Sequence, residues 1–134
     1  MSIYKTIRAA LDVKLASVSG LPDVVFANVP YQESPDTAFI TANLTPVSRR
    51  PAVVGYNPQQ EYRGLYSIVI CTPENQGVGT AYSYADIIAE AFDATTDISY
   101  SGEVVSVDYS EVGTSYYDSP FYRTPVTIGW HIYN

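Results

Sequence analysis

The end of the chain alternates between two rows of side chains, and this period of two constrains the fold more than any other feature. One row is almost entirely apolar or aromatic: Tyr122, Thr124, Val126, Ile128, Trp130 and Ile132. Because successive side chains of a strand point to opposite faces, the row predicts a long β-strand over residues 121–133 with one buried face. Pro125 lies on the other row and lacks a ladder donor, so we expect that part of the strand at an edge or a bulge.

The start of the chain has a helical period instead. Apolar side chains recur at steps of three or four residues: Ile3, Ile7, Leu11, Leu15 and Val18. This spacing predicts an amphipathic helix over residues 2–19, ended by Gly20 and Pro22. A second helix is predicted from Thr80 to about Ala94, with an inner face made of Ala81, Tyr84, Ala85, Ile88 and Phe92.

Further strands are predicted at residues 23–28, 38–47, 61–72 and 103–109. The strand at 61–72 becomes apolar on both faces, which is typical of a central strand. Residues 46–60 contain three prolines, Gly55 and the pair Arg49-Arg50, and we expect a long loop there. The predicted fold is therefore a single α+β domain over residues 1–134. Its order is α-β-β-β-α-β-β, with two helices packed on a mainly antiparallel or mixed sheet.

The charge balance restricts the function. Fourteen acidic and seven basic residues give a net charge of −7, which argues against a protein that coats nucleic acid. The combination of 13 tyrosines with two lysines is typical of protein–protein interfaces. No apolar run approaches the roughly 20 residues of a membrane helix, so we expect no membrane association. The first residues lack the apolar stretch of a signal peptide, and we expect synthesis in the cytoplasm.

Few residues could perform catalysis or hold a metal. Cys71 and His131 are the only cysteine and the only histidine, so an internal disulfide and most metal sites are excluded. We interpret His131 as an edge-strand or interface residue and Cys71 as a small buried hydrophobe. The segment GVG at 77–79 resembles an anion-binding turn only weakly, and a flexible turn is favoured. We expect no catalytic, metal or cofactor-binding residues.

Several charged and aromatic residues are candidates for an interface. The outer face of the second predicted helix carries Tyr82, Asp86, Glu90 and Asp93. These carboxylates form a solvated face, meet basic groups of a neighbour, or line a cavity that repels polyanions. Arg49 and Arg50 either solubilise their loop or anchor it on an acidic partner. Tyr116 and Tyr117 lie in a connection at residues 113–120, where a neighbouring molecule could use them.

Seven short segments, in this order, resemble the tail terminator (tail completion) proteins of long-tailed bacteriophages. They are IRAAL (7–11), GLP (20–22), FANVPY (26–31), RRP (49–51), YRG (62–64), GVGTA (77–81) and PVTI (125–128). No single segment is specific, but the ordered set runs over nearly the whole chain.

The resemblance implies a structural protein of the virion, made and assembled in the cytoplasm of the bacterial host. Such proteins form a homohexameric ring on the head-proximal end of the tail tube, in which the sheets of neighbours join. The ring ends tube polymerisation at the length set by the tape measure protein and presents a docking face to head-completion or stopper proteins. DNA passes through it without specific binding. On this hypothesis the loop at 48–60 would order against the tail tube protein, and the acidic helix face would lie at the lumen or at a subunit contact.

Three other functions compete with this one. A head–tail joining or stopper protein would be a neighbour in the same connector, and a tail tube subunit would share a related fold. A small hydrolase is the most distant alternative and would depend on His131, the only imidazole.

Overall fold

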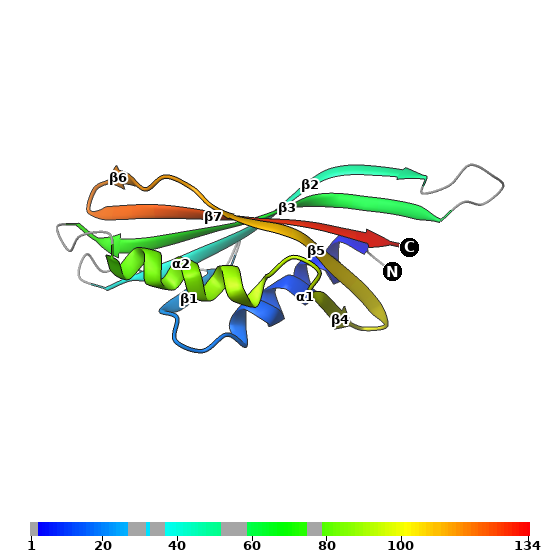
Figure 1. The fold of residues 1–134 in the computed structure, drawn as a ribbon, viewed down its shortest axis with the longest axis horizontal. Helices are drawn as coiled ribbons and strands as arrows, with labels where there is room; N and C mark the ends of the chain where they lie inside the picture. The colour runs from blue at the N-terminus through cyan, green and yellow to red at the C-terminus, as the bar shows by residue number, and fades with distance from the viewer. Residues whose placement is uncertain (1–2, 27–31, 33–36, 52–58, 75–78) are drawn as a thin grey trace.

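The computed structural model describes residues 3–26, 32, 37–51, 59–74 and 79–134 (Figure 1). Helices α1 (Ile3–Ala16) and α2 (Gly79–Ala91) lie on the same face of one seven-stranded sheet, which curls into a half-barrel. The other face of the sheet carries no helix in the described part of the chain. The predicted α+β class and the two helices packed on a mixed sheet are confirmed.

The sheet has the order β1-β2-β3-β7-β5-β4, and β6 pairs with β7 beyond the end of β5. The pair β1–β2 is parallel and all other pairs are antiparallel. The strands are β1 (Asp23–Phe26), β2 (Phe39–Pro51), β3 (Gln60–Pro73), β4 (Asp97–Tyr100), β5 (Glu103–Val112), β6 (Tyr116–Asp118) and β7 (Phe121–Tyr133).

Strands β3 and β7 form the axis of the sheet. They pair from Glu61 opposite Tyr133 to Pro73 opposite Phe121, so both run the length of the molecule. The apolar row predicted at the chain end faces the helices and is buried, apart from the half-buried Tyr122. The long final strand and the central third strand are thus confirmed.

Pro125 lies in an internal strand, so the prediction of an edge position is wrong. The ladder is nevertheless interrupted beside it: β5 ends at Val112, and pairing with β7 resumes only at Tyr116. Gly113 donates its N–H to the carbonyl oxygen of Pro125 at 2.8 Å. Since the nitrogen and carbonyl of one strand residue face the same neighbour, the missing donor of Pro125 faces the gap between β5 and β6.

Two short strands, β4 and β6, were not predicted, and the observed order is α-β-β-β-α-β-β-β-β. In β4 only Ile98 is buried, and all three residues of β6 are exposed, so neither strand has an alternating apolar pattern. Strand β5 also extends to Val112, beyond the predicted end at residue 109.

Residues 46–51 continue strand β2, and the prediction of a loop there is wrong. Gln60 exchanges two hydrogen bonds of 2.9 Å with Asn134, so its amide faces β7. Pro51 of β2 lies opposite Gln60, so the nitrogen of Pro51 points away from β3. Pro46 lies opposite Gly64, and because the direction of the backbone groups alternates along β3, the nitrogen of Pro46 also points away from β3. Both prolines therefore withhold a donor only from the outer edge of β2, which no described strand covers at these positions and where proline is tolerated. Residues 52–58 of the predicted loop lie outside the described residues, as do Ser2, Gly77 and Val78.

The main core fills the space between the helices and the inner face of the sheet, and a smaller buried cluster of Phe39, Cys71 and Phe121 is separate from it. The predicted inner faces of both helices are confirmed: Ile7, Leu11 and Leu15 of α1 and Ala81, Ala85 and Ile88 of α2 are buried. No helix among the described residues is long and apolar enough to cross a membrane.

One buried polar contact ties α1 to the centre of the sheet. The hydroxyl of Tyr66 in β3 donates to the carboxylate of Asp12 at 2.5 Å, and Arg8 pairs with the same carboxylate at 3.2 Å. Burial of the Tyr66 ring is the main cause that raises the pKa of the phenol far above its usual range, and the hydrogen bond to the Asp12 carboxylate raises it further. The hydroxyl therefore stays a donor, and it fixes the position of α1 on β3.

Gly64 permits one of the two closest approaches in the sheet; the other is at Gly129, beside the ring of Tyr109. A Cβ atom at Gly64 would lie 2.4 Å from the indole of Trp130 and 2.6 Å from the backbone oxygen of Thr45. Trp130 is fully buried and packs over the glycine from the neighbouring strand β7. The indole thus occupies space that any other residue would fill.

Replacing Gly64 by alanine should lower the free energy of unfolding by about 2 kcal/mol or more, because backbone as well as indole must shift. Chemical denaturation measures this change. Gly79→Ala is the matched control, because a Cβ there meets nothing within 4 Å. Equal stability of the two variants would contradict the close packing of Trp130 on β3.

Replacing Tyr66 by phenylalanine should lower the free energy of unfolding by about 2 kcal/mol, since it removes a buried hydrogen bond to a charged group. Tyr84→Phe is the control, because its hydroxyl forms no hydrogen bond within the described residues. An unchanged denaturation midpoint for Tyr66→Phe would show that this contact does not hold α1.

Candidate interaction surfaces

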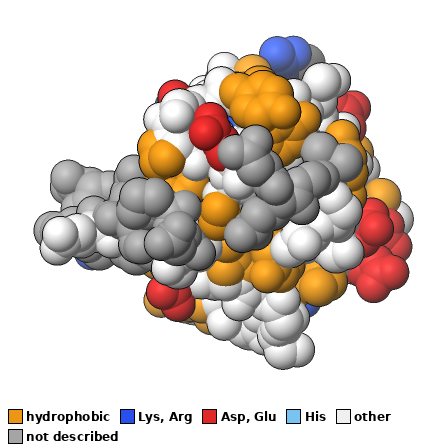
Figure 2. Space-filling model, turned by 90° about the vertical axis from the view of Figure 1, so that its left-hand side faces the viewer, with side chains coloured by type: hydrophobic (Ala, Val, Ile, Leu, Met, Phe, Trp, Pro, Cys, Tyr) orange, Lys and Arg blue, Asp and Glu red, His pale blue; other side chains and the backbone are white. Residues whose placement is uncertain are grey.

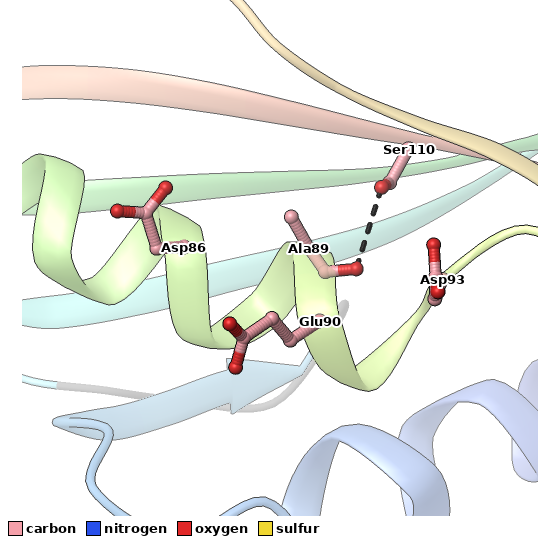
Figure 3. A pocket seen from close by; sticks show the side chains of 5 residues that line it. All are labelled: Asp86, Ala89, Glu90, Asp93 and Ser110. Carbon is pink, nitrogen blue, oxygen red and sulfur yellow. Dashed lines mark hydrogen bonds between the residues drawn. The ribbon is translucent and has the colours of Figure 1, made fainter.

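The acidic side of α2 lines a shallow groove. Asp86, Glu90 and Asp93 are exposed and, with Ala89 and with Ser110 of β5, enclose about 400 Å³. The hydroxyl of Ser110 donates to the Ala89 carbonyl at 3.5 Å and thereby links β5 to α2 beside the groove (Figure 3). Figure 3 shows Asp86 and Glu90 on α2 and Asp93 just beyond its end, so the three carboxylates do not converge on one point.

The groove is a site of unneutralised negative charge. None of its three carboxylates has a cationic partner among the described residues, and Asp93 only accepts the Ala94 N–H at 2.9 Å. No group of three potential metal ligands exists in the part of the chain that the structure describes. An uncompensated acidic surface attracts cationic groups and repels phosphate. The predicted interface or lumen role of these residues stays a prediction.

A basic arm projects at one end of the sheet, where β2 and β3 extend beyond β1. We call residues 46–51 and 60–63 the arm; it lies at the right-hand end of Figure 1. Arg49 donates to the hydroxyl of Tyr62 at 2.9 Å, and its guanidinium lies 5.6 Å from the centre of that ring. Tyr4 of α1 packs edge-on against Tyr62 at 5.5 Å. Arg49 and Arg50 therefore lie in a strand braced by α1, not in a loop as predicted.

The two arginines differ in their surroundings. Arg49 is bound within its own chain, whereas Arg50 is exposed and has no partner among the described residues. The bulge at Val47 interrupts the register between Pro46 and Ser48 and leaves the Val47 side chain 65% exposed. The outer surface of the arm thus combines a cation that has no partner among the described residues with the exposed side chain of Val47.

A tyrosine hairpin lies at the opposite end of the sheet. It comprises β6, the turn with a cis Ser119–Pro120 bond, and the start of β7. Tyr116 and Tyr117 are 48% and 73% exposed, and the Tyr117 ring stacks edge-on against Tyr122 at 4.6 Å. Arg123 pairs with Asp118 at 2.6 Å and braces the hairpin.

Figure 2 views this end of the molecule and shows hydrophobic side chains exposed across it, with acidic side chains gathered on the right-hand side. Tyr82, on the outer face of α2, is 39% exposed. Sequence reasoning proposed these tyrosines for contacts with neighbours, and that role stays a prediction.

A polar network on the helix-free face was missed by sequence reasoning. His131 Nδ1 lies 2.5 Å from Asp108, whose second oxygen accepts a hydrogen bond from Arg63 at 3.1 Å. Arg63 also donates to Glu61 at 2.7 Å, and this hydrogen bond lowers the pKa of the Glu61 carboxyl. The network joins β3, β7 and β5, so it appears only once their register is known.

His131 is half-buried in an internal strand, so its predicted place on an edge strand is wrong. Ser106 lies opposite it in β5, but the serine hydroxyl donates to Asp97 at 2.8 Å. Among the described residues, no hydroxyl or thiol nucleophile is hydrogen-bonded to the imidazole. The contact of the imidazole with Asp108 links β7 to β5.

The comparisons with known proteins give a family and a shared fold. Residues 4–130 match the family described as phage tail terminator protein. A solved structure with 20% sequence identity has a TM-score of 0.74 over 98% of this chain and 96% of that chain, which establishes a shared fold. No curated protein matches the chain.

The contact between His131 and Asp108 should contribute about 1 kcal/mol to stability. We expect a double-mutant cycle with His131→Ala and Asp108→Ala to give a coupling free energy of that size in denaturant unfolding. Additive effects of the two substitutions would show that the contact does not stabilise the sheet.

Proposed function

Because the chain belongs to the phage tail terminator protein family, we propose that it caps the head-proximal end of the tail tube as a homohexameric ring. The observation that carries this proposal is the family match over residues 4–130, nearly the whole chain. The family is one of structural phage proteins, so this chain is a component of the phage tail, and hence of the virion, and not an enzyme.

The shape of the subunit supports a ring. The arm and the tyrosine hairpin are chemically different surfaces at opposite ends of one sheet (Figure 1). A contact between unlike surfaces of identical subunits is heterologous, and such contacts form a closed ring when the rotation between neighbours closes. A subunit of this kind does not need a two-fold dimer to bury its exposed ends.

Termination follows from the two faces of such a ring. One face matches the end of the growing tube and binds the tail tube protein, after which no further tube subunit can add. The other face docks the head-completion or stopper protein. The tape measure protein, which sets the length, would end beneath the ring. Assembly takes place in the cytoplasm of the bacterial host.

The acidic groove has a role in this proposal. Six copies at −7 each carry −42, and the carboxylates of α2 are not neutralised within the described part of the subunit. At the lumen they would keep DNA from binding the wall during its passage, because they repel phosphate. At a subunit contact they would meet basic groups of the neighbour.

Native mass spectrometry or sedimentation, with and without isolated tail tube ends, tests the ring. We expect a six-fold species on tube ends. A stable dimer under both conditions would overturn the proposal.

Electron microscopy of phage particles that lack the protein separates the related functions. Loss of a terminator should give overlong tubes. Tubes of normal length would instead indicate a joining or stopper protein, and growth of the purified protein into long tubes would indicate a tube subunit.

Neutralising the groove with Asp86→Asn, Glu90→Gln and Asp93→Asn should lower the infectious titre at least about tenfold, through ring assembly or DNA passage. The matched control is Asp23→Asn, Glu74→Gln and Glu111→Gln, which removes the same charge elsewhere. Equal titres of the two triple variants would show that only net charge matters and not the α2 groove.

A further inference from the structure

We propose that the arm of one subunit docks on the tyrosine hairpin of the next, with Arg50 lying over the exposed ring of Tyr117. This inference rests on the proposed ring and names the surfaces that close it. The partner is a second copy of this chain.

Both surfaces are held in place within the subunit. The arm is fixed by the hydrogen bond from Arg49 to Tyr62 and by the packing of Tyr4 on that ring. The hairpin is fixed by the ion pair of Arg123 with Asp118 and by the stacking of Tyr117 on Tyr122. Surfaces that are already ordered lose little conformational entropy when they associate.

The arm and the hairpin are chemically complementary. Arg50 is a cation without a partner in the described residues, and Tyr117 is the most exposed large hydrophobic side chain among them, at 73%. A guanidinium over an aromatic face is an attractive pair, and arginine and tyrosine are enriched at the centres of interfaces. The subunit already uses this contact internally, where Arg49 lies 5.6 Å from the Tyr62 ring and Arg123 5.9 Å from the Phe121 ring.

The edge of the arm favours contact through side chains. Strand β1 covers β2 only from Phe39 to Ala42, so the outer edge of the arm is unpaired among the described residues. Pro46 and Pro51 remove donors from that edge, which disfavours extension of the sheet by backbone pairing. The exposed side chains Val47 and Arg50 are therefore the groups that make the contact.

The positions of the two surfaces allow a contact only between subunits. The arm and the hairpin lie at opposite ends of the longest axis of the molecule, so they meet only between copies (Figure 1). Because the two surfaces differ, each subunit uses both, one toward each neighbour. The α2 groove is a competing acceptor for Arg50, but its carboxylates do not converge on a single cation (Figure 3).

Photo-crosslinking tests the proposal. Tyr117 is replaced by p-benzoylphenylalanine, and the full-length variant is assembled on tube ends with isotopically labelled wild-type subunits. We expect crosslinks from position 117 to residues 46–51 or 60–63 of the other copy. The same photoprobe at Val13, which is 54% exposed on α1, is the control and should not reach the arm.

The possible outcomes distinguish failure of the contact between arm and hairpin from failure of the ring. A six-fold species whose crosslinks run from position 117 to α2, to another hairpin or to the tube protein overturns the inference and leaves the ring intact. A six-fold species with no crosslink between subunits does the same. Absence of any six-fold species overturns the ring.

Substitutions measure the strength of the contact. Tyr117→Ala and Arg50→Ala should each raise the concentration for half-maximal assembly about tenfold, whereas Tyr117→Phe, which keeps the ring face, should stay within about twofold of wild type. Val13→Ala is the exposed control. Equal losses for Tyr117→Phe and Tyr117→Ala would overturn the stacking of a cation on the ring.

Discussion

The pairing of β3 with β7 is the constraint on which the rest of the structure depends. These strands stay in register over their whole lengths, and Trp130 of one packs over Gly64 of the other. At about 3.3 Å per residue, strands of this kind span roughly 40 Å. One end of the pair carries the arm, because β3 begins there, and the other end carries the hairpin, because β7 begins there. The length of a single strand pair thus sets the separation of the two surfaces proposed for assembly.

The helices pack on one face of the sheet, and hydrogen bonds and ion pairs between side chains link the strands on the other face. Hydrophobic burial attaches both helices to the inner face, and the contact of Tyr66 with Asp12 gives α1 a defined position. On the helix-free face, Asp108 joins three neighbouring strands through Arg63 and His131. Asp12, Arg63 and Asp108 are thus paired within the subunit, whereas the carboxylates of the groove and Arg50 have no charged partner among the described residues.

Periodicity made much of the fold predictable. The inner faces of both helices and the apolar row of β7 follow from spacing alone, because burial on one face imposes that spacing. The same reasoning could not find β4 and β6, whose residues are mostly exposed and carry no alternating row. Periodicity also predicted a loop at residues 46–51, because proline usually interrupts a strand. Proline is tolerated in a strand when its nitrogen faces an unpaired edge, and the sequence does not show which edge of a strand is unpaired. Of the candidate surfaces, the exposure of Asp86, Glu90 and Asp93 was predictable from the helical period. The contact of Arg49 with Tyr62 and the contact of His131 with Asp108 depend on strand register, so they could not be predicted from the sequence.

The central claim is that this protein ends tube growth by capping. The most direct measurement follows purified tail tube subunits as they polymerise, with electron microscopy of tube lengths and quantification of bound protein. The account predicts that saturating amounts of this protein arrest elongation, with six copies bound at each capped end. Tubes that continue to lengthen in its presence would contradict the account.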